Sequence, residues 1–417
     1  MKCHLTRYGN IQPSTIESLT YCPTGKYLAC TREEGVVEIY STTRYTLLQR
    51  YPLSPIKGSC KSSCWDGEIL YVGGSAKKVW GIKVSEGRIV TTLNISAKVT
   101  CLSFNGYLFV GTEKSAVEFY SKSEHDSTSL WSEGLLNHSK GRTTCIDVLG
   151  DSVFVGTSEG LVFGWVKKGK SFELVFTVYS TDPIREAKYN LSRHELNFSL
   201  PEQEDIKKEQ WDYVEVPQRY TPVCALKLID AMTVAVGSSH GKIQIWDIMS
   251  MTIIAEFKEH QADVLCFALS GTTLYASGVD HKIVEFKECD GRWKSRKRVR
   301  YHTHTVKSLA VNQHHLVSGG VDTTFFVLDN KNIDSIILRR FPFGRTNSAV
   351  HICPVARIVV MLEKPNVISF YTLQPSEPFS DHSSEIKSAD YDLLYQIVLA
   401  KDCQVNCFTV NTTCSQL

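Results

Sequence analysis

The chain has 417 residues, which is long enough for more than one hydrophobic core. Lys and Arg together number 46 and Asp and Glu 44, so the global charge excludes a generally basic nucleic-acid-binding protein and leaves room only for a local patch. No segment reaches the roughly 18 apolar residues of a membrane span, and the N-terminus lacks a signal peptide, so we expect an intracellular protein that does not cross a membrane.

One sequence pattern returns about every forty residues along the chain. An apolar strand is followed by a small residue, a polar turn and a second alternating strand, as in Leu28–Tyr40, Leu108–Tyr120, Val153–Trp165 and Val234–Asp247. Further copies centre on Lys77, Asp280, Asp322, Asn366 and Asp402. Each copy is typical of a β-hairpin, since one face alternates apolar and Gly or Asp permits a positive φ at the turn. The repeat length is that of a four-stranded blade, so the sequence predicts an all-β fold, the WD40 β-propeller.

In chain order, the hairpins predict seven four-stranded blades that close a ring within residues 1–341. Their expected ranges are 15–53, 56–94, 97–132, 140–177, 221–257, 260–299 and 303–341. Two weaker copies follow, at 347–373 and 384–410. We therefore expect residues 342–417 to contain two further blades and to begin a second propeller.

Between the fourth and fifth blades, the spacing of the copies doubles. The extra stretch, 178–219, is rich in charged residues and lacks strand alternation. It predicts an insertion that leaves the ring as a surface loop and is partly disordered. A degenerate blade is the alternative, which Pro183, Pro201 and Pro217 disfavour.

Polar residues near the turns of the later blades predict a structural network. In WD40 blades a His, a Ser or Thr and an Asp hydrogen-bond one another, because unpaired polar groups at a half-buried turn would cost stability. The expected members are His260, Ser277, Asp280, His304, Ser318 and Asp322, with Trp246 and Asp247 in the preceding blade. A Ser-His-Asp hydrolase is the alternative interpretation, but no nucleophile elbow or oxyanion-hole glycine run accompanies these residues. We expect no catalytic residue.

Metal and cofactor sites have no convincing motif in this sequence. Around the cluster His302, His304, His314 and His315, no Cys or carboxylate completes a tetrahedral set at ligand spacing. The 14 cysteines are scattered, mostly in apolar runs, and lack zinc-like spacing, so we expect them to be reduced. A phosphate-binding loop is also missing from the sequence. We expect no metal, no cofactor and no small-molecule substrate.

The strongest charge feature is a basic run in the expected outer strand of the sixth blade. Its cations are Arg292, Lys294, Arg296, Lys297, Arg298 and Arg300. A regular strand would place all of them except Lys297 on one side, which suits RNA phosphates or an acidic partner. The alternative is a charged edge strand that prevents aggregation between sheets.

Several segments resemble the cirhin family of WD40 proteins. The most specific are Tyr301–Leu309 and His315–Thr323, while Glu34–Tyr40 and Gly241–Asp247 match in kind and in order. The resemblance runs thinly along nearly the whole chain and continues through the weak copy that begins at Asn347. The family carries two complete propellers, whereas 342–417 hold only two copies, and the insertion is longer than expected.

The resemblance implies a non-enzymatic scaffold of the nucleolar small-subunit processome, acting in pre-18S ribosomal RNA processing. Its implied partners are other WD40 subunits of the processome and pre-ribosomal RNA or U3 small nucleolar RNA. A protein-only adaptor, such as a substrate receptor of a ubiquitin ligase, is the alternative. It predicts an Arg-lined pocket for acidic peptides and little association with RNA. An enzyme is a more remote alternative.

Overall fold

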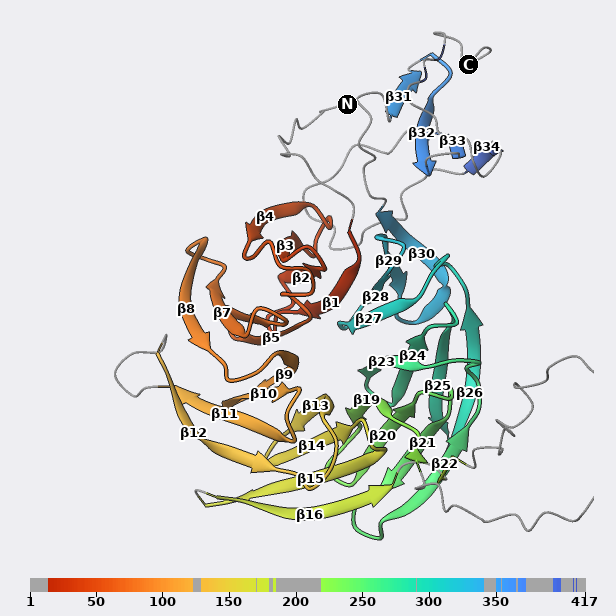
Figure 1. Ribbon diagram of the computed structural model, residues 1–417. Coiled ribbons are helices and arrows are strands. Elements are labelled where there is room, and N and C mark those ends of the chain that lie inside the picture. Colours follow the sequence, from red (N-terminus) through yellow and green to blue (C-terminus); the bar gives the residue numbers. More distant parts are fainter. Residues whose placement is uncertain are drawn as a thin grey trace, which may run out of the picture.

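The computed structural model consists of strands and turns arranged mainly around a ring (Figure 1). It describes residues 14–122, 129–169, 171–179, 183–184, 219–289, 291–340, 350–353, 355–364, 367–372, 393–398, 408 and 410. Within these ranges no helix long and apolar enough for a bilayer was found. Every sheet except one short pair is four-stranded, with its strands in chain order.

The first four blades are formed from sixteen consecutive strands. The first blade contains β1 (Ile16–Tyr21), β2 (Tyr27–Arg32), β3 (Val36–Ser41) and β4 (Leu47–Pro52). The second contains β5 (Ser62–Asp66), β6 (Ile69–Gly73), β7 (Lys78–Lys83) and β8 (Arg88–Asn94). The third contains β9 (Val99–Asn105), β10 (Tyr107–Thr112), β11 (Ala116–Lys122) and β12 (Leu130–Asn137). The fourth contains β13 (Thr143–Leu149), β14 (Ser152–Thr157), β15 (Leu161–Lys168) and β16 (Ser171–Tyr179). The third blade thus ends five residues later than the sequence indicated.

Three more blades complete the ring after the insertion. The fifth contains β19 (Val223–Leu228), β20 (Thr233–Ser238), β21 (Ile243–Asp247) and β22 (Thr252–Phe257). The sixth contains β23 (Val264–Ser270), β24 (Thr273–Gly278), β25 (Ile283–Cys289) and β26 (Arg292–Val299). The seventh contains β27 (Val306–Val311), β28 (His315–Gly320), β29 (Phe325–Asp329) and β30 (Asn332–Arg340).

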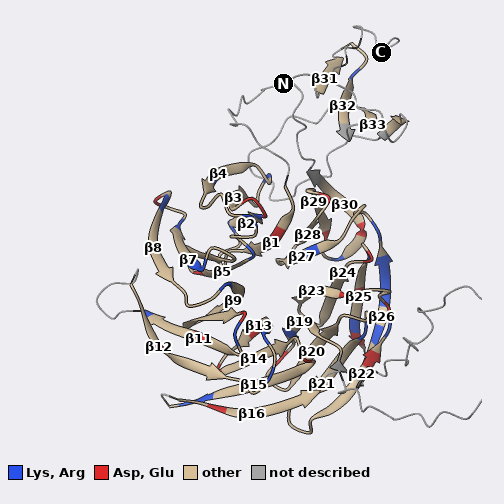
Figure 2. Ribbon diagram, viewed as in Figure 1, with Lys and Arg blue, Asp and Glu red and all other residues tan. Residues whose placement is uncertain are grey.

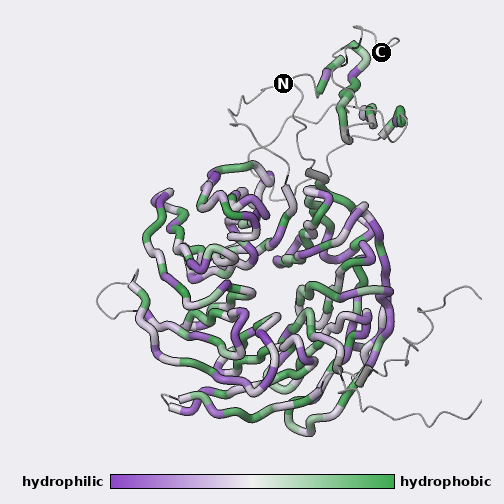
Figure 3. Tube along the Cα trace, in the orientation of Figure 1, coloured by the Kyte–Doolittle hydropathy of each residue, from purple (hydrophilic) through white to green (hydrophobic). Residues whose placement is uncertain are grey.

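The strand pattern follows from where each strand lies in its blade. Second strands such as β10 are buried along nearly their whole length, because a neighbouring blade covers each face of the sheet. Fourth strands such as β4 alternate between partly buried and exposed residues. Figure 3 shows this as hydrophobic residues along the inner strands and mostly hydrophilic residues along β26. The repeated small residue has a packing reason: a Cβ on Gly111 would meet Cys101 Sγ at 2.4 Å and Thr143 Cγ2 of the next blade at 2.8 Å.

The ring closes between the seventh and first blades, where β27 packs against β1. Ile16, Leu19, Phe325 and Val327 belong to one apolar cluster across this seam. Leu19 N donates to Ser308 Oγ at 2.8 Å, and Arg32 Nη1 donates to the Thr323 carbonyl at 2.9 Å. These features confirm the predicted fold class, a WD40 β-propeller.

The insertion begins and ends at a short antiparallel pair, β17 (Pro183–Ile184) and β18 (Arg219–Tyr220). Residues 185–218, which make up most of the expected insertion 178–219, lie outside the described residues. The pairing of Ile184 with Arg219 brings the two ends of this stretch together, so the chain returns to the ring close to where it left.

After the ring, the described strands form one sheet where the sequence predicted two blades. This sheet contains β31 (Val350–Cys353), β32 (Ile358–Lys364), β33 (Val367–Thr372) and β34 (Leu393–Val398). The second weak copy supplies β34 as the fourth strand of the first copy's sheet, and the rest of that copy lies outside the described residues apart from 408 and 410. Cys353 is disulfide-bonded, which contradicts the expectation that all cysteines are reduced. That 342–417 begin a second propeller stays a prediction.

Candidate nucleic-acid interface

Five of the six cations of the basic run lie on β26, the outer strand of the sixth blade, and Arg300 directly follows it. β26 pairs with β25 alone in its sheet, so its cations lie at the periphery of the ring (Figure 2). Two apolar residues of the strand, Trp293 and Val299, are each 8% exposed and hold it to the core. The exposed residues are Arg292, Lys294, Arg296, Arg298 and Arg300.

A β-bulge divides the strand into two parts. Ser295 pairs with Phe286 and Arg298 with Val284, so Arg296 and Lys297 together lie opposite a single residue of β25. Such an extra residue reverses the faces taken by the residues that follow it. Accordingly, Trp293 packs in a cluster with the fifth blade and Val299 in a cluster with the seventh.

The expectation that five cations share one side is therefore wrong. Arg292 and Lys294 precede the bulge, and Arg298 and Arg300 follow it. The predicted single row of charges becomes two shorter groups, one on each side of the sixth blade.

Two of the cations already form ion pairs with carboxylates, one toward the seventh blade and one toward the fifth. Lys297 Nζ lies 2.7 Å from Asp334 Oδ2 of the seventh blade. Arg298 Nη2 lies 2.7 Å from Glu259 Oε2, which directly follows the fifth blade. Both side chains remain substantially exposed, at 42% and 57%, so these pairs contribute little to stability but reduce the free charge.

The remaining cations of the run are available to an external anion. Arg292, Lys294, Arg296 and Arg300 make no ion pair within the described residues, and Arg296 donates only to Cys289 Sγ, at 3.2 Å. Lys287 of β25 pairs directly with Lys294 across the sheet, and like charges in that position repel each other. Sequence reasoning missed Lys287, although its place in the strand just before the basic run was a usable signal. Phosphate groups bound here would relieve the repulsion between Lys287 and Lys294.

In the sixth blade, the expected polar residues lie at one turn but do not form a closed network. His260 Nδ1 lies 2.8 Å from Asp280 Oδ1, and Ser277 Oγ donates to the Lys282 carbonyl at 2.6 Å. His260 Nε2 is buried without a hydrogen-bond partner among the described residues. Burial would raise the pKa of the Asp280 carboxyl, but the hydrogen bond and charge of His260 outweigh it and lower the pKa from 3.8 to about 2.

In the seventh blade, the histidine of the network is His302, which corrects the expectation of His304. His302 Nδ1 lies 2.8 Å from Asp322 Oδ2, and its Nε2 lies 2.8 Å from Ser318 Oγ. His304 is exposed and bonds through Nδ1 to the Thr303 hydroxyl at 2.9 Å. Although Ser318, His302 and Asp322 are connected in the order of a catalytic triad, Ser318 is 0% exposed, so no substrate can approach its hydroxyl.

The Trp-Asp pair at the end of β21 has a local role. Trp246 Nε1 donates to Gln244 Oε1 at 3.3 Å, and Asp247 Oδ1 accepts from the backbone of Met249 and Ser250. The carboxylate thus caps the turn between β21 and β22.

The histidine cluster does not converge on one point. His302 is held by Asp322 and Ser318, while His315 Nδ1 lies 2.8 Å from the Tyr45 hydroxyl on the other side of the closing seam. Across the described part of the chain, no group of three or more potential ligands could hold a metal ion.

Comparison with known proteins gives a consistent but distant set of relatives. No family model matches the chain. The U3 small nucleolar RNA-associated protein 4 of Saccharomyces cerevisiae is 24% identical over 388 residues, covering 82% of this chain and 44% of that protein. The Mus musculus homolog of that protein is 23% identical over 368 residues, covering 82% of this chain and 48% of its own length. The Schizosaccharomyces pombe protein of the same name is 26% identical over 188 residues, covering 43% of this chain and 24% of that protein.

Among solved structures, the computationally designed Ika8 protein resembles the chain with a TM-score of 0.55 and 14% identity, covering 84% of this chain and 93% of that one. This likeness concerns the fold alone. The chain spans less than half the length of the curated relatives that it matches. It is thus a WD40 β-propeller chain similar, along most of its length, to proteins associated with U3 small nucleolar RNA.

Proposed function

We propose that this chain is a non-enzymatic WD40 scaffold that acts in the nucleolus, in pre-18S ribosomal RNA processing and small-subunit assembly. The observation that carries the proposal is the similarity to U3 small nucleolar RNA-associated protein 4 from yeast and mouse, which extends over 82% of this chain. A rigid ring suits such a role because its two faces and its rim can each hold a different partner. The buried polar networks contribute to the ring, and the accessible surfaces make the contacts.

The proposed partners are other WD40 subunits of a small-subunit processome and pre-ribosomal RNA or U3 small nucleolar RNA. The unpaired cations of β26, together with Lys287, are the proposed contact for RNA phosphates. Charge neutralisation at such a contact releases counterions and makes binding strongly dependent on salt. Edge protection of the sixth blade is the alternative role of the strip.

Affinity purification of the full chain from cells tests the function. Sequencing of the bound RNA should recover pre-18S or U3 RNA, and mass spectrometry of the bound proteins should recover other propeller subunits. Recovery of ubiquitin-ligase subunits without RNA would instead support the protein-only adaptor.

Charge reversal of Arg292, Lys294 and Arg296 to Glu tests the interface itself. These three are preferable to Arg298, whose reversal would also disrupt the Glu259 pair. We expect several-fold weaker crosslinking to RNA and a salt dependence shallower by about 2 in log–log slope, since each single-strand phosphate contact contributes roughly 0.7.

A control variant carries the same change of charge elsewhere on the ring, through reversal of Lys26, Lys57 and Lys140, which are all exposed and make no ion pair within the described residues. It should retain crosslinking. Unchanged crosslinking in the folded β26 variant would return the strip to edge protection.

A further inference from the structure

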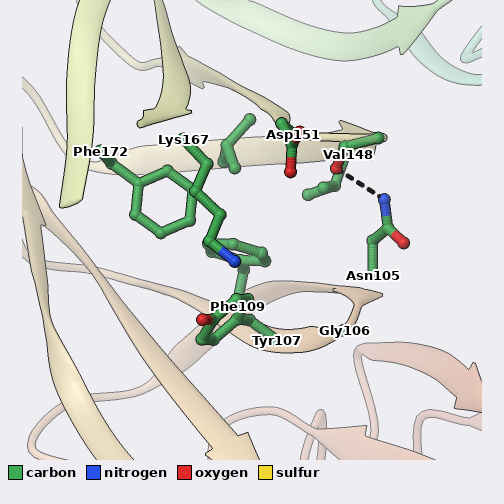
Figure 4. Close-up of a pocket in the computed structure, with 10 residues that line it drawn as sticks. Asn105, Gly106, Tyr107, Phe109, Val148, Asp151, Lys167 and Phe172 are labelled. Atoms are coloured by element: carbon green, nitrogen blue, oxygen red, sulfur yellow. Dashed lines mark hydrogen bonds between the residues drawn. The ribbon is translucent and has the colours of Figure 1, made fainter. Parts of the chain in front are cut away.

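A half-open cavity of about 290 Å³ lies between the third and fourth blades, on a different part of the ring from β26. It is formed where β9 turns into β10 and β13 into β14, and the start of β16 supplies one wall (Figure 4). Phe109 and Val153 are almost fully buried and line its inner part. Tyr107 and Phe172, with ring centroids 6.1 Å apart, add aromatic surface nearer the opening.

Charged and polar groups surround the aromatic part of this cavity. Lys167 extends over the Tyr107 ring, with its Nζ 4.7 Å from the ring centroid. Asp151 points into the space beside it, and Asn105 Nδ2 donates to the Gly150 carbonyl at 2.8 Å (Figure 4). Cationic, anionic and amide groups therefore meet at one aromatic surface.

The two charged side chains of the cavity have no ionic partner among the described residues. The next residue along the strand behaves differently: Lys168 Nζ lies 2.6 Å from Glu173 Oε2, on the outside of the blade. Asp151 and Lys167 are joined only through their backbones, by Lys167 N donating to the Asp151 carbonyl at 2.9 Å. The carboxylate thus makes no ion pair, and the ammonium faces only the Tyr107 ring, so both can bind a ligand that offers donors and an acceptor together.

We propose that this cavity binds a single unpaired guanine base of an RNA strand. Guanine presents two neighbouring N–H donors, which a carboxylate accepts, beside a carbonyl oxygen that an ammonium group can donate to. Its plane would lie against the aromatic side chains, as single-stranded bases do in other RNA-binding proteins. The inference rests on the proposed association with RNA and adds base specificity to it.

Other occupants satisfy the cavity less well. Adenine has one donor and one acceptor on the corresponding edge, so Asp151 would lose a partner. An aromatic side chain of a peptide would contact Phe172 and Tyr107 but leave both charged groups without partners. The volume is close to the lower end of the roughly 300–1,000 Å³ of small-molecule sites, which suits one base better than a larger cofactor.

Mononucleotides test the cavity without any other RNA contact. In the full chain with labelled valine methyl groups, GMP should shift the NMR signals of Val148 and Val153, which line the cavity. IMP lacks the 2-amino donor and should bind about tenfold more weakly, the loss of one hydrogen bond to a charged group. AMP should bind more weakly than GMP. Shifts caused by N-acetyl-phenylalaninamide and not by GMP would overturn the proposal in favour of a protein partner.

Two variants and a matched control connect these shifts to the chemistry. Asp151→Asn should abolish the preference for GMP over AMP, because an amide cannot accept both guanine donors. Lys167→Ala should weaken GMP binding, whereas Lys168→Ala, which removes the neighbouring charge outside the cavity, should not. A thermal unfolding curve for each variant checks that the ring is intact, and equal losses in all three variants would contradict the assignment.

Oligonucleotides separate this inference from the proposed function. A labelled single strand of adenosines with one central guanosine should bind severalfold more tightly than the same strand without it, and Asp151→Asn should remove the difference. Binding of both strands with equal affinity would overturn the guanine site and leave the β26 interface standing. If neither strand binds and GMP causes no shift, both proposals fail.

Discussion

The sixth and seventh blades place a His, a Ser and an Asp at corresponding turns, but the connections differ. In the seventh blade, His302 bridges Asp322 and Ser318 with two bonds of 2.8 Å. In the sixth, His260 reaches Asp280, whereas Ser277 turns away to the Lys282 carbonyl. A serine hydroxyl carries one proton, and Ser277 donates its proton to a backbone carbonyl instead of to the imidazole of His260.

The difference follows from the position of the serine: His and Asp are 20 residues apart in both blades, but Ser318 lies four residues before Asp322 and Ser277 only three before Asp280. Because successive residues of a strand point to opposite faces, the two hydroxyls project from opposite faces of their strands. The seventh-blade set is complete and lies beside the seam that closes the ring, where Thr323 accepts from Arg32. The sixth-blade set leaves His260 Nε2 buried and unpaired among the described residues, a state that costs stability. We therefore expect the seventh-blade residues to couple more strongly than those of the sixth.

The largest expected effect is that of Asp322→Ala. The substitution removes the acceptor of His302 and of the Thr303 and Thr324 backbone N–H groups, and it should lower the free energy of unfolding by about 1–3 kcal/mol. Denaturant unfolding measures the change. Asp334→Ala, at an exposed carboxylate of the same blade, is the control and should change stability by less than about 0.5 kcal/mol. An equal effect of the two would contradict a buried network.

A pair of double-mutant cycles compares the two blades directly. Ser318→Ala combined with His302→Ala should give a coupling energy of about 0.5–3 kcal/mol, because the two side chains share a hydrogen bond. Ser277→Ala combined with His260→Ala should be additive within about 0.5 kcal/mol, since no such bond joins them. Equal couplings in both blades would show that Ser277 turns toward His260 in solution.

The smallest expected effect is that of His304→Ala. Its ring is exposed, bonds to the neighbouring hydroxyl and lies 6.5 Å from the His281 ring, so the free energy of unfolding should change by less than about 0.5 kcal/mol. His302→Ala, two residues earlier, should be clearly destabilising under the same conditions. A larger loss of unfolding free energy in His304→Ala than in His302→Ala would restore His304 as the histidine of the network, as the sequence first suggested.

The correct histidine was nevertheless present as a signal in the sequence. His260 precedes Asp280 by 20 residues, and His302 precedes Asp322 by the same 20, whereas His304 is two residues closer. Comparing the two copies residue by residue would have selected His302. The strands themselves were predictable because alternating apolar runs and Gly or Asp turns recur with the blade period.

The division of β26 was harder to predict from sequence. Trp293 and Val299 are six positions apart, so regular alternation places them on one side, yet each blade has two buried faces and the two residues pack on different ones. Nothing in a run of exposed cations indicates which residue bulges. The packing of Phe286 and Val284 against the fifth blade decides the register, and that is a property of the assembled ring.

The closure of the ring also has a consequence for chain connectivity. Each of the seven blades uses four consecutive strands, so no sheet in the ring combines the two ends of the described propeller. The seam between β27 and β1 therefore resembles the other seams in that no strand pairing of a sheet crosses it. A circular permutant of the ring that joins its original ends and opens between Asn94 and Val99 would preserve every sheet. The order in which the blades are synthesised is therefore not part of what specifies the ring.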